Sequence, residues 1–147
     1  MSDLVSLPCL CATVRRAGRA LTSLYDEALS KHEMTVTQFT ILQALQLAGP
    51  VSQGQLSKIL AIDSTTLTRS LRALLKNGWV QRAEGEDRRA WRLALSKQGQ
   101  KVFTRALPDW ERVQETLRKK LGSQSWLNAF QSSNLLTAAV QNIGENE

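Results

Sequence analysis

Two helix-capping boxes in close succession constrain the fold of this chain more than any other feature. Thr35-x-x-Gln38 and Ser52-x-x-Gln55 each place a hydroxyl residue three positions before a glutamine. That pattern closes the amino end of an α-helix. Asp63 can cap a third helix in the same way. The sequence therefore predicts three helices, the last two of them short and joined by a tight turn.

A β-hairpin is predicted directly after these helices. The short stretch 79–82 consists of β-prone residues, and residues 83–89 form a charged stretch that contains a glycine. Residues 91–95 then alternate between apolar and polar side chains. This pattern is typical of two strands around a polar turn, with Arg88 and Arg89 at or near the tip. Cap, helix, cap, helix and hairpin in this order predict a winged helix-turn-helix.

Long amphipathic helices are predicted on both sides of this unit. Residues 8–31 and 103–121 repeat apolar side chains at spacings of three and four, as expected for helices with one apolar stripe. A last helix is predicted at 125–143, and Pro108 is expected to kink the helix before it or to cost that helix a hydrogen bond. The fold is therefore expected to be mainly α with a small β-hairpin wing. The apolar stripes could pack on their own domain or on a partner chain.

Positive charge is concentrated in the middle of the chain. The whole sequence of 147 residues has 19 basic and 13 acidic side chains, a net charge of +6. Residues 50–105 hold eleven of the basic and four of the acidic side chains, a net charge of +7, whereas the flanks sum to −1. A basic centre between near-neutral arms favours a polyanionic partner. The alternative is a solvated surface that happens to be basic.

The sequence offers little for catalysis. His32 is the single histidine, and no glycine-rich phosphate loop, HExxH or GxSxG motif is present. We therefore expect no enzyme, no cofactor and no metal site. The Cys9-x-Cys11 pair is a poor chelator, because residues two apart on a helix point roughly 200° apart.

The expected compartment is the cytoplasm. No run of about 18 apolar residues could span a membrane, so we expect no membrane partner. The first residues have neither a basic lead nor an apolar core, and a secretory signal is not expected. Two cysteines separated by one residue make a poor disulfide framework.

The exposed face of the helix after Asp63 is the candidate DNA-reading surface. The second helix of a helix-turn-helix pair enters the major groove. Small hydroxyls at its start allow close approach to bases, and the cations further along suit guanine edges or phosphates. The candidates are Ser64, Thr65, Thr66, Thr68, Arg69, Arg72 and Lys76. The hairpin tip, with Arg88 and Arg89, has the right length to reach an adjacent minor groove. The alternative is a solvated helix face and a charged loop.

The chain resembles the MarR family of transcriptional regulators over nearly its whole length. The residues that carry the resemblance are Leu29 to Gln38-Phe39, Leu56-Ser57-x-x-Leu60, Thr65-Thr66-Leu67-Thr68-Arg69, Leu74-x-x-x-Gly78-x-Val80-x-Arg82, Asp87-x-Arg89 and Leu95-Ser96-x-x-Gly99. Two positions depart from the family pattern, since Ser96 replaces the usual Thr and Trp79 replaces the usual Leu.

The resemblance implies a homodimer on a pseudo-palindromic double-stranded DNA site. It implies one chain, 1–147, with dimerisation helices at 8–34 and 100–143 and a winged helix-turn-helix lobe at 35–99. It further implies that Arg89 enters the minor groove and that Asp87 orients it. A local ion pair that holds the hairpin shape is the alternative role of Asp87.

The family usually represses transcription and releases DNA on a signal, which is a small, often aromatic anion or the oxidation of a cysteine. The chain is also similar to the branch that senses organic hydroperoxides, with Cys11 at its reactive cysteine and Tyr25 at a tyrosine that bonds it. Arg15 stands where that branch has a second tyrosine. A helix N-terminus and Arg15 would both stabilise a Cys11 thiolate, and Cys9 lies beside it. The alternative for both cysteines is simple packing.

A ligand pocket is the other route to a signal. The family pocket lies between the first helix, the fifth helix and the DNA-binding lobe. Phe39 and Trp110 could supply its aromatic wall, and Arg15 could pair with an anion. The alternative is that both rings belong to the core. Two other classes of function remain open, a helical protein–protein adaptor without DNA binding and a thiol enzyme that uses Cys11.

Overall fold

The computed structural model describes residues 5–84 and 91–144. In chain order the elements are α1 (Leu10–Leu29), the 3-10 turn η1 (Ser30–His32), α2 (Val36–Ala48), α3 (Gln53–Leu60), α4 (Ser64–Lys76), β1 (Val80–Glu84), β2 (Trp91–Leu95), α5 (Lys97–Leu121) and α6 (Ser123–Gly144). The two strands form one antiparallel hairpin. The prediction of a mainly α chain with a β-hairpin wing is confirmed.

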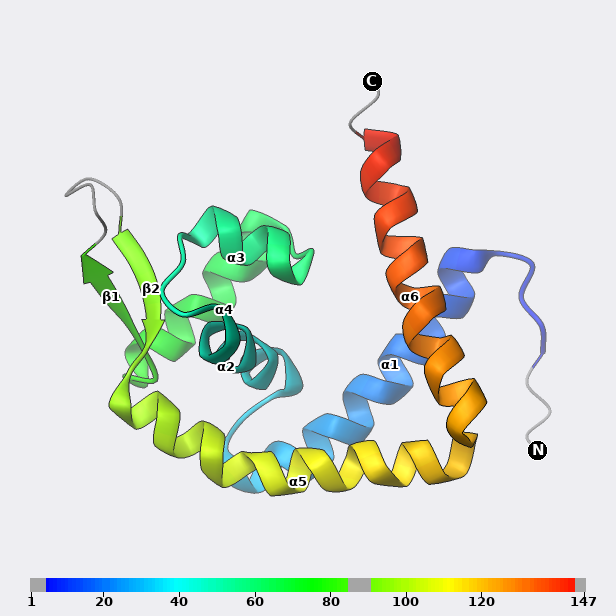
Figure 1. Ribbon diagram of the computed structural model, residues 1–147, viewed down its shortest axis with the longest axis horizontal. Coiled ribbons are helices and arrows are strands. Elements are labelled where there is room, and N and C mark those ends of the chain that lie inside the picture. Colours follow the sequence, from blue (N-terminus) through cyan, green and yellow to red (C-terminus); the bar gives the residue numbers. More distant parts are fainter. Residues whose placement is uncertain (1–4, 85–90, 145–147) are drawn as a thin grey trace.

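The elements are arranged as a U (Figure 1). The long helix α5 forms the base. A lobe made of α2, α3, α4 and the hairpin stands on the amino-terminal end of α5, and α1 and α6 rise at the other end. The chain therefore separates a compact lobe from two long arms.

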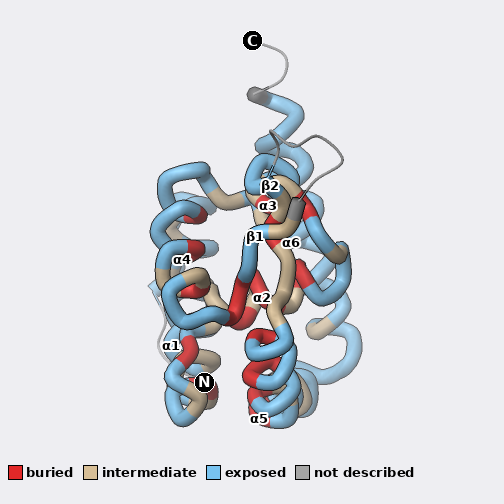
Figure 2. The backbone as a smooth tube through the Cα atoms, turned by 90° about the vertical axis from the view of Figure 1, so that its left-hand side faces the viewer, coloured by how far each residue is buried: buried red, intermediate tan, exposed pale blue. Residues whose placement is uncertain are grey.

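The hydrophobic core lies in the lobe and extends onto the first half of α5. Phe39 of α2 is fully buried at its centre. Its ring stacks on Phe103 and Trp110 of α5, at centroid distances of 5.0 and 5.5 Å. In Figure 2 the buried residues gather in the lobe and on α5, whereas α6 is almost wholly exposed. The lobe is thus a packed unit, and the arms are not.

All three predicted helix caps are present. Thr35 and Ser52 each form the complete capping box with the glutamine three residues later. The side chain of Asp63 accepts a hydrogen bond from the backbone N–H of Thr66. Local sequence therefore fixes where α2, α3 and α4 begin.

The first helix is shorter than the predicted 8–31. It begins at Leu10, with Cys9 in extended conformation at the N-cap, and ends at Leu29. The chain then tightens into η1, and Glu33 takes a left-handed conformation with φ of 54°. Lys31 fits the polar face of the predicted helix, so the pattern of the sequence did not mark the end at Leu29. Helix α5 runs through Pro108 as one element from Lys97 to Leu121.

Ser96 joins the hairpin to α5. Its hydroxyl donates to the carbonyl oxygens of Gly78 and Trp79, at 2.5 and 3.1 Å, and accepts from the backbone N–H of Gly99 at 2.9 Å. A Cβ at Gly99 would overlap the carbonyl oxygen of Trp79. The close approach of α5 to the base of the hairpin thus explains the Leu95-Ser96-x-x-Gly99 motif.

None of the helices within the described ranges combines the length and the apolar character needed to cross a membrane.

Candidate nucleic-acid interface

Helix α4 packs one face on the core and turns the other outward. Leu67, Leu71 and Leu74 are buried. All the side chains proposed to read DNA from this helix are exposed: Ser64, Thr65, Thr66, Thr68, Arg69, Arg72 and Lys76. The structure therefore brings these candidates together on one helix surface.

Two of the candidate hydroxyls already have partners within the protein. Thr66 donates from Oγ1 to Asp63 Oδ2 at 2.5 Å, and Thr68 donates from Oγ1 to the carbonyl oxygen of Ser64 at 2.8 Å. Thr68 also accepts from Nε2 of Gln53 at 2.8 Å. The proton of each hydroxyl is therefore engaged. The side chains of Thr65 and Arg69, by contrast, have no hydrogen-bond or ion-pair partner in the described part of the chain.

Asp63 keeps its charge at the start of this helix. Hydrogen bonds from the side chain and backbone of Thr66 hold the pKa of its carboxyl below the usual range. A carboxylate is the favourable cap for the positive end of a helix dipole. Its role here is to fix the first turn of α4.

Sequence reasoning missed three residues next to α4. Gln53 connects the first turn of α3 to Thr68. Arg82 of β1 and Trp91 of β2 line a groove of about 360 Å³ between α4 and the hairpin. The other lining residues are Gln53, Thr68, Leu71, Arg72, Leu75 and Leu93. Trp91 remains 60% exposed, which is a large apolar surface to leave in water. The sequence signal for Arg82 and Trp91 was their place in the two strands.

The proposed wing-tip residues Asp87, Arg88 and Arg89 lie outside the described residues.

The two candidate redox cysteines lie on the arm formed by α1, away from α4 and the hairpin (Figure 1). Cys9 and Cys11 are both exposed and free, at the amino end of α1. Tyr25 is 14 positions after Cys11 on the same helix, about 21 Å along its axis, so the two cannot touch within one chain. Its hydroxyl instead donates to Oε1 of Gln114 at 2.9 Å. Burial raises the pKa of the Tyr25 phenol.

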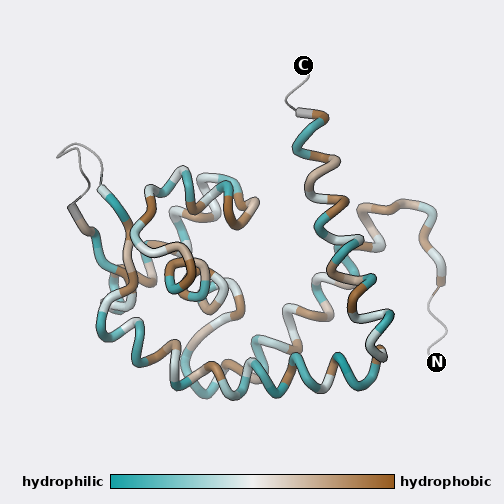
Figure 3. The backbone as a smooth tube through the Cα atoms, viewed as in Figure 1, coloured by the Kyte–Doolittle hydropathy of each residue, from teal (hydrophilic) through white to brown (hydrophobic). Residues whose placement is uncertain are grey.

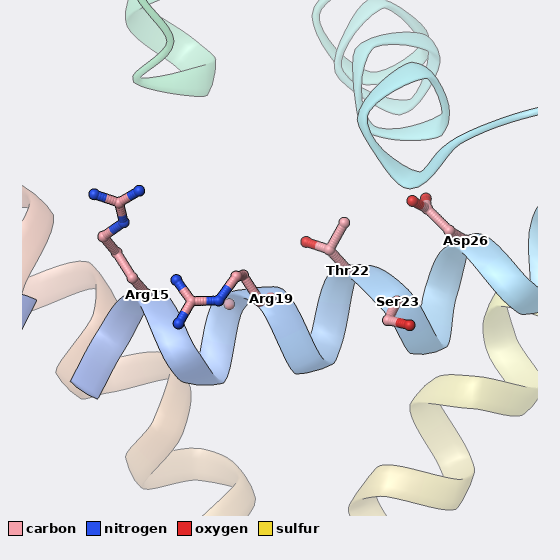
Figure 4. A pocket seen from close by; sticks show the side chains of 6 residues that line it. Arg15, Arg19, Thr22, Ser23 and Asp26 are labelled. Carbon is pink, nitrogen blue, oxygen red and sulfur yellow. The ribbon is translucent and has the colours of Figure 1, made fainter. Parts of the chain in front are cut away.

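Arg15 and the two proposed pocket rings are not brought together. Phe39 and Trp110 stack inside the lobe core. Arg15 instead lines an open hollow of about 610 Å³ along α1, with Gly18, Arg19, Thr22, Ser23 and Asp26. Figure 4 shows the Arg15 guanidinium standing away from α1 toward the lobe, with Arg19 beside it. Asp26 points to α2, where Oδ1 accepts from the backbone N–H of Val36 at 2.7 Å.

A buried acidic residue at the joint between arms and lobe was also missed. Asp109 of α5 is buried and contacts three cationic or ionisable groups. Its Oδ1 lies 2.8 Å from Lys31 Nζ and 2.7 Å from Arg112 Nη1, and its Oδ2 lies 2.8 Å from His32 Nε2. Hydrogen bonds from Lys31 and His32 hold the pKa of Asp109 well below its usual range. This cluster ties η1 to α5.

Within residues 5–84 and 91–144, no group of three or more His, Cys, Asp and Glu side chains could hold a metal ion.

Comparison with known proteins relates this chain to transcriptional regulators. The MarR family model matches residues 34–91. The chain is 30% identical over 90 residues to the uncharacterized HTH-type transcriptional regulator YwoH of Bacillus subtilis, covering 61% of this chain and 66% of YwoH. The match thus spans just under two thirds of that relative's length.

Two solved structures share the fold over most of the chain. The regulator MosR of M. tuberculosis in complex with DNA superposes with a TM-score of 0.82 at 31% identity, covering 92% of this chain and 98% of MosR. A mutant of MarR from E. coli complexed with operator DNA gives a TM-score of 0.78 at 23% identity, covering 86% and 92%. The second likeness concerns the fold alone.

Proposed function

This chain belongs to the MarR family of transcriptional regulators, and we propose that it is a sequence-specific repressor that binds double-stranded DNA as a homodimer. The observation that carries the proposal is the outward face of α4, where Thr65, Arg69, Arg72 and Lys76 are exposed beside the hairpin. Membership of this family favours a transcriptional regulator over an enzyme. Such a regulator would act in the cytoplasm.

Binding would divide between two kinds of contact. Helix α4 would lie in the major groove, where Thr65 and Arg69 would meet base edges. Lys and Arg side chains on phosphates would supply most of the affinity. Arg89, oriented by Asp87, would enter the minor groove, as the resemblance to the family implies.

The arms would form the dimer. Apolar side chains stand exposed along α1 and α6, among them Leu10, Val14, Leu21, Leu127, Leu135, Val140 and Ile143, and Figure 3 shows hydrophobic positions recurring along α6. Monomeric proteins rarely leave so extended an apolar surface in water. A second copy of the chain would cover it, and the two-fold symmetry would require a pseudo-palindromic site.

Release of DNA would follow one of two signals. A small aromatic anion could pair with Arg15 and Arg19 in the hollow of Figure 4. Alternatively, an oxidant such as an organic hydroperoxide could react with Cys11, which is exposed. In that case Tyr25 could meet Cys11 only across the dimer, because the two are about 21 Å apart on one helix.

The test is fluorescence anisotropy on DNA from just upstream of the protein's own gene, against a scrambled duplex and across a salt series. We expect selective binding that weakens steeply with salt. Arg69→Ala should reduce the preference for the selected duplex by about tenfold, the worth of one good base contact. If reduced and refolded protein bound no genomic fragment selectively, or bound without salt dependence, the adaptor alternative would replace this proposal.

A further inference from the structure

We propose that the groove between α4 and the hairpin seats one backbone phosphate of bound DNA between Arg72 and Arg82, with Trp91 against the adjoining deoxyribose. The inference rests on the proposed function, because it names which part of the DNA this groove would hold. It adds Arg82 and Trp91 to the interface.

The hairpin register turns Arg82 and Trp91 toward α4. Arg82 is paired directly with Leu93, and directly paired residues share one face of an antiparallel sheet. Trp91 is two residues before Leu93 and therefore lies on the same face. Leu93 is buried against the lobe, so this face of the hairpin looks inward, across the groove.

Helix α4 supplies the opposite wall. Thr68, Leu71, Arg72 and Leu75 line the groove, at the spacings of three and four that keep side chains on one helix face. Leu71 and Leu93 are buried and form its apolar floor. The hydrogen bond from Gln53 to Thr68 fixes the rim at the start of α3. Both walls of the groove are therefore fixed in place by residues that pack in the hydrophobic core.

The chemistry of the groove suits a phosphodiester. The guanidinium groups of Arg72 and Arg82 have no ion-pair or hydrogen-bond partner among the residues that the structure describes, and none of the lining residues with a described side chain is acidic. Guanidinium groups bind phosphate oxygens with two parallel hydrogen bonds. The exposed indole of Trp91 offers an apolar surface beside them, which matches the face of a sugar. Sugar and phosphate are thus both accommodated.

The position of the groove also fits. It lies between the helix proposed for the major groove and the hairpin proposed for the minor groove (Figure 1). The DNA strand that separates these two grooves must cross this gap, and it presents its phosphates there. Contacts to that strand set the position of a protein on the duplex without reading sequence.

The test uses the full-length protein in the same anisotropy assay, on the selected duplex and the scrambled one. Arg82→Ala should weaken binding to both duplexes by the same factor, about fivefold, and should lower the salt slope by part of the ~0.9 that one phosphate contributes, because Arg72 still contacts that phosphate. Arg82→Lys should keep the slope. Trp91→Ala should weaken both duplexes without changing the slope, because it removes no charge.

Arg105→Ala is the matched control. It removes the same charge from an exposed position on α5 outside the groove, and it should leave the affinity and the slope close to those of the wild type. Replacing single phosphates by neutral methylphosphonates should reveal one position whose replacement weakens binding of the wild type more than it weakens binding of Arg82→Ala. Thermal unfolding would establish that each variant is folded.

The outcomes separate this inference from the proposed function. If the wild type binds DNA and Arg82→Ala behaves like Arg105→Ala, the phosphate seat is wrong and the function stands. If Arg82→Ala lowers affinity for the selected duplex alone, Arg82 reads a base and the inference is again wrong. A wild type with no DNA affinity overturns both.

Discussion

At the scale of single residues, Asp109 holds the joint between the arms and the lobe. Its two carboxylate oxygens bridge Lys31 and His32 of η1 to α5, with Arg112 alongside. Asp26 makes a second tie nearby, since its carboxylate accepts from the first backbone N–H of α2. These contacts fix how α1 leaves the lobe, and therefore how two lobes would be spaced in a dimer.

We expect Asp109→Asn to lower the unfolding midpoint at pH 7 by several degrees. The pKa of Asp109 is depressed in the folded protein, so its stabilising contribution is complete above the unfolded value of about 3.9. It is lost as the pH falls through the folded pKa. Thermal unfolding of the wild type and of Asp109→Asn across pH should therefore show a difference between the two midpoints that shrinks below about pH 4.

Glu115→Gln provides the control on the same helix. The pKa of Glu115 is also lowered, by Arg118 and Lys119, but these partners are exposed and screened by water. Its effect at pH 7 should be small. If the difference in unfolding midpoint between Asp109→Asn and the wild type were the same at pH 7 and in acid, the stabilising role of the Asp109 carboxylate charge would be contradicted.

Gly99 is the second residue whose identity the fold requires. A methyl group there would overlap the Trp79 carbonyl oxygen, so the hairpin and α5 would have to separate. We expect Gly99→Ala to destabilise the protein by about 1–3 kcal/mol, the usual cost of overpacking. In Gly54→Ala the added Cβ would meet Ser52 Oγ at 4.0 Å, an ordinary van der Waals contact, and this variant should be neutral or slightly stabilising. Chemical denaturation would measure both, and equal midpoints for the two variants would refute this account.

At the scale of elements, the threonine hydroxyls of α4 differ in whether they have a partner within the protein. Thr68 ties α4 to α3 through Gln53, whereas Thr65 has no partner within the described chain. The sequence presented them as equivalent, because both are small, polar and on the outer face. The hydrogen bonds of Thr68 to Ser64 within α4 and to Gln53 of α3 distinguish them.

We therefore expect opposite results from two matched substitutions. Thr68→Val should cost about 1 kcal/mol of stability, the net worth of a hydrogen bond, and should leave the ratio of affinities for selected and scrambled duplexes nearly unchanged. Thr65→Val should keep the stability and change that ratio. Unfolding curves and anisotropy titrations on both variants would decide, and the reverse pattern would show that the assignments had been exchanged.

At the scale of the whole molecule, the U shape leaves the arms without a core of their own. Every described side chain of α6 is at least partly exposed, although the helix carries Leu, Val and Ile and its hydrophobic positions recur along its length (Figure 3). A hollow of about 320 Å³ between α1, α5 and α6 is lined by Leu21, Leu117, Leu121, Trp126 and Phe130, among others. A second chain would fill this shape.

We expect Val140→Glu to dissociate the proposed dimer without unfolding the lobe. Val140 is 67% exposed in one chain, so the charge costs little in a monomer, but it would be buried in a dimer interface at a large cost. Gln131→Glu adds the same charge at a polar position of α6. Sedimentation velocity would compare the two, and a Val140→Glu protein that stayed dimeric would place the interface elsewhere.

The helix caps, the hairpin and the apolar stripes could all be predicted from the order of residues along the chain. These features depend on residues a few positions apart, such as Thr35 with Gln38 or Asp63 with Thr66, and short-range contacts leave a pattern that can be read along the chain. The winged fold followed from their order. Family resemblance supplied the proposed role of each part.

Only the tertiary structure decided which side chains are free to act. His32 meets Asp109 across 77 positions, and Tyr25 meets Gln114 across 89. Arg82 and Trp91 face α4 because of the strand register, and Phe39 and Trp110 stack in the core, away from Arg15. Such pairings depend on how distant elements pack, and local periodicity carries no information about them.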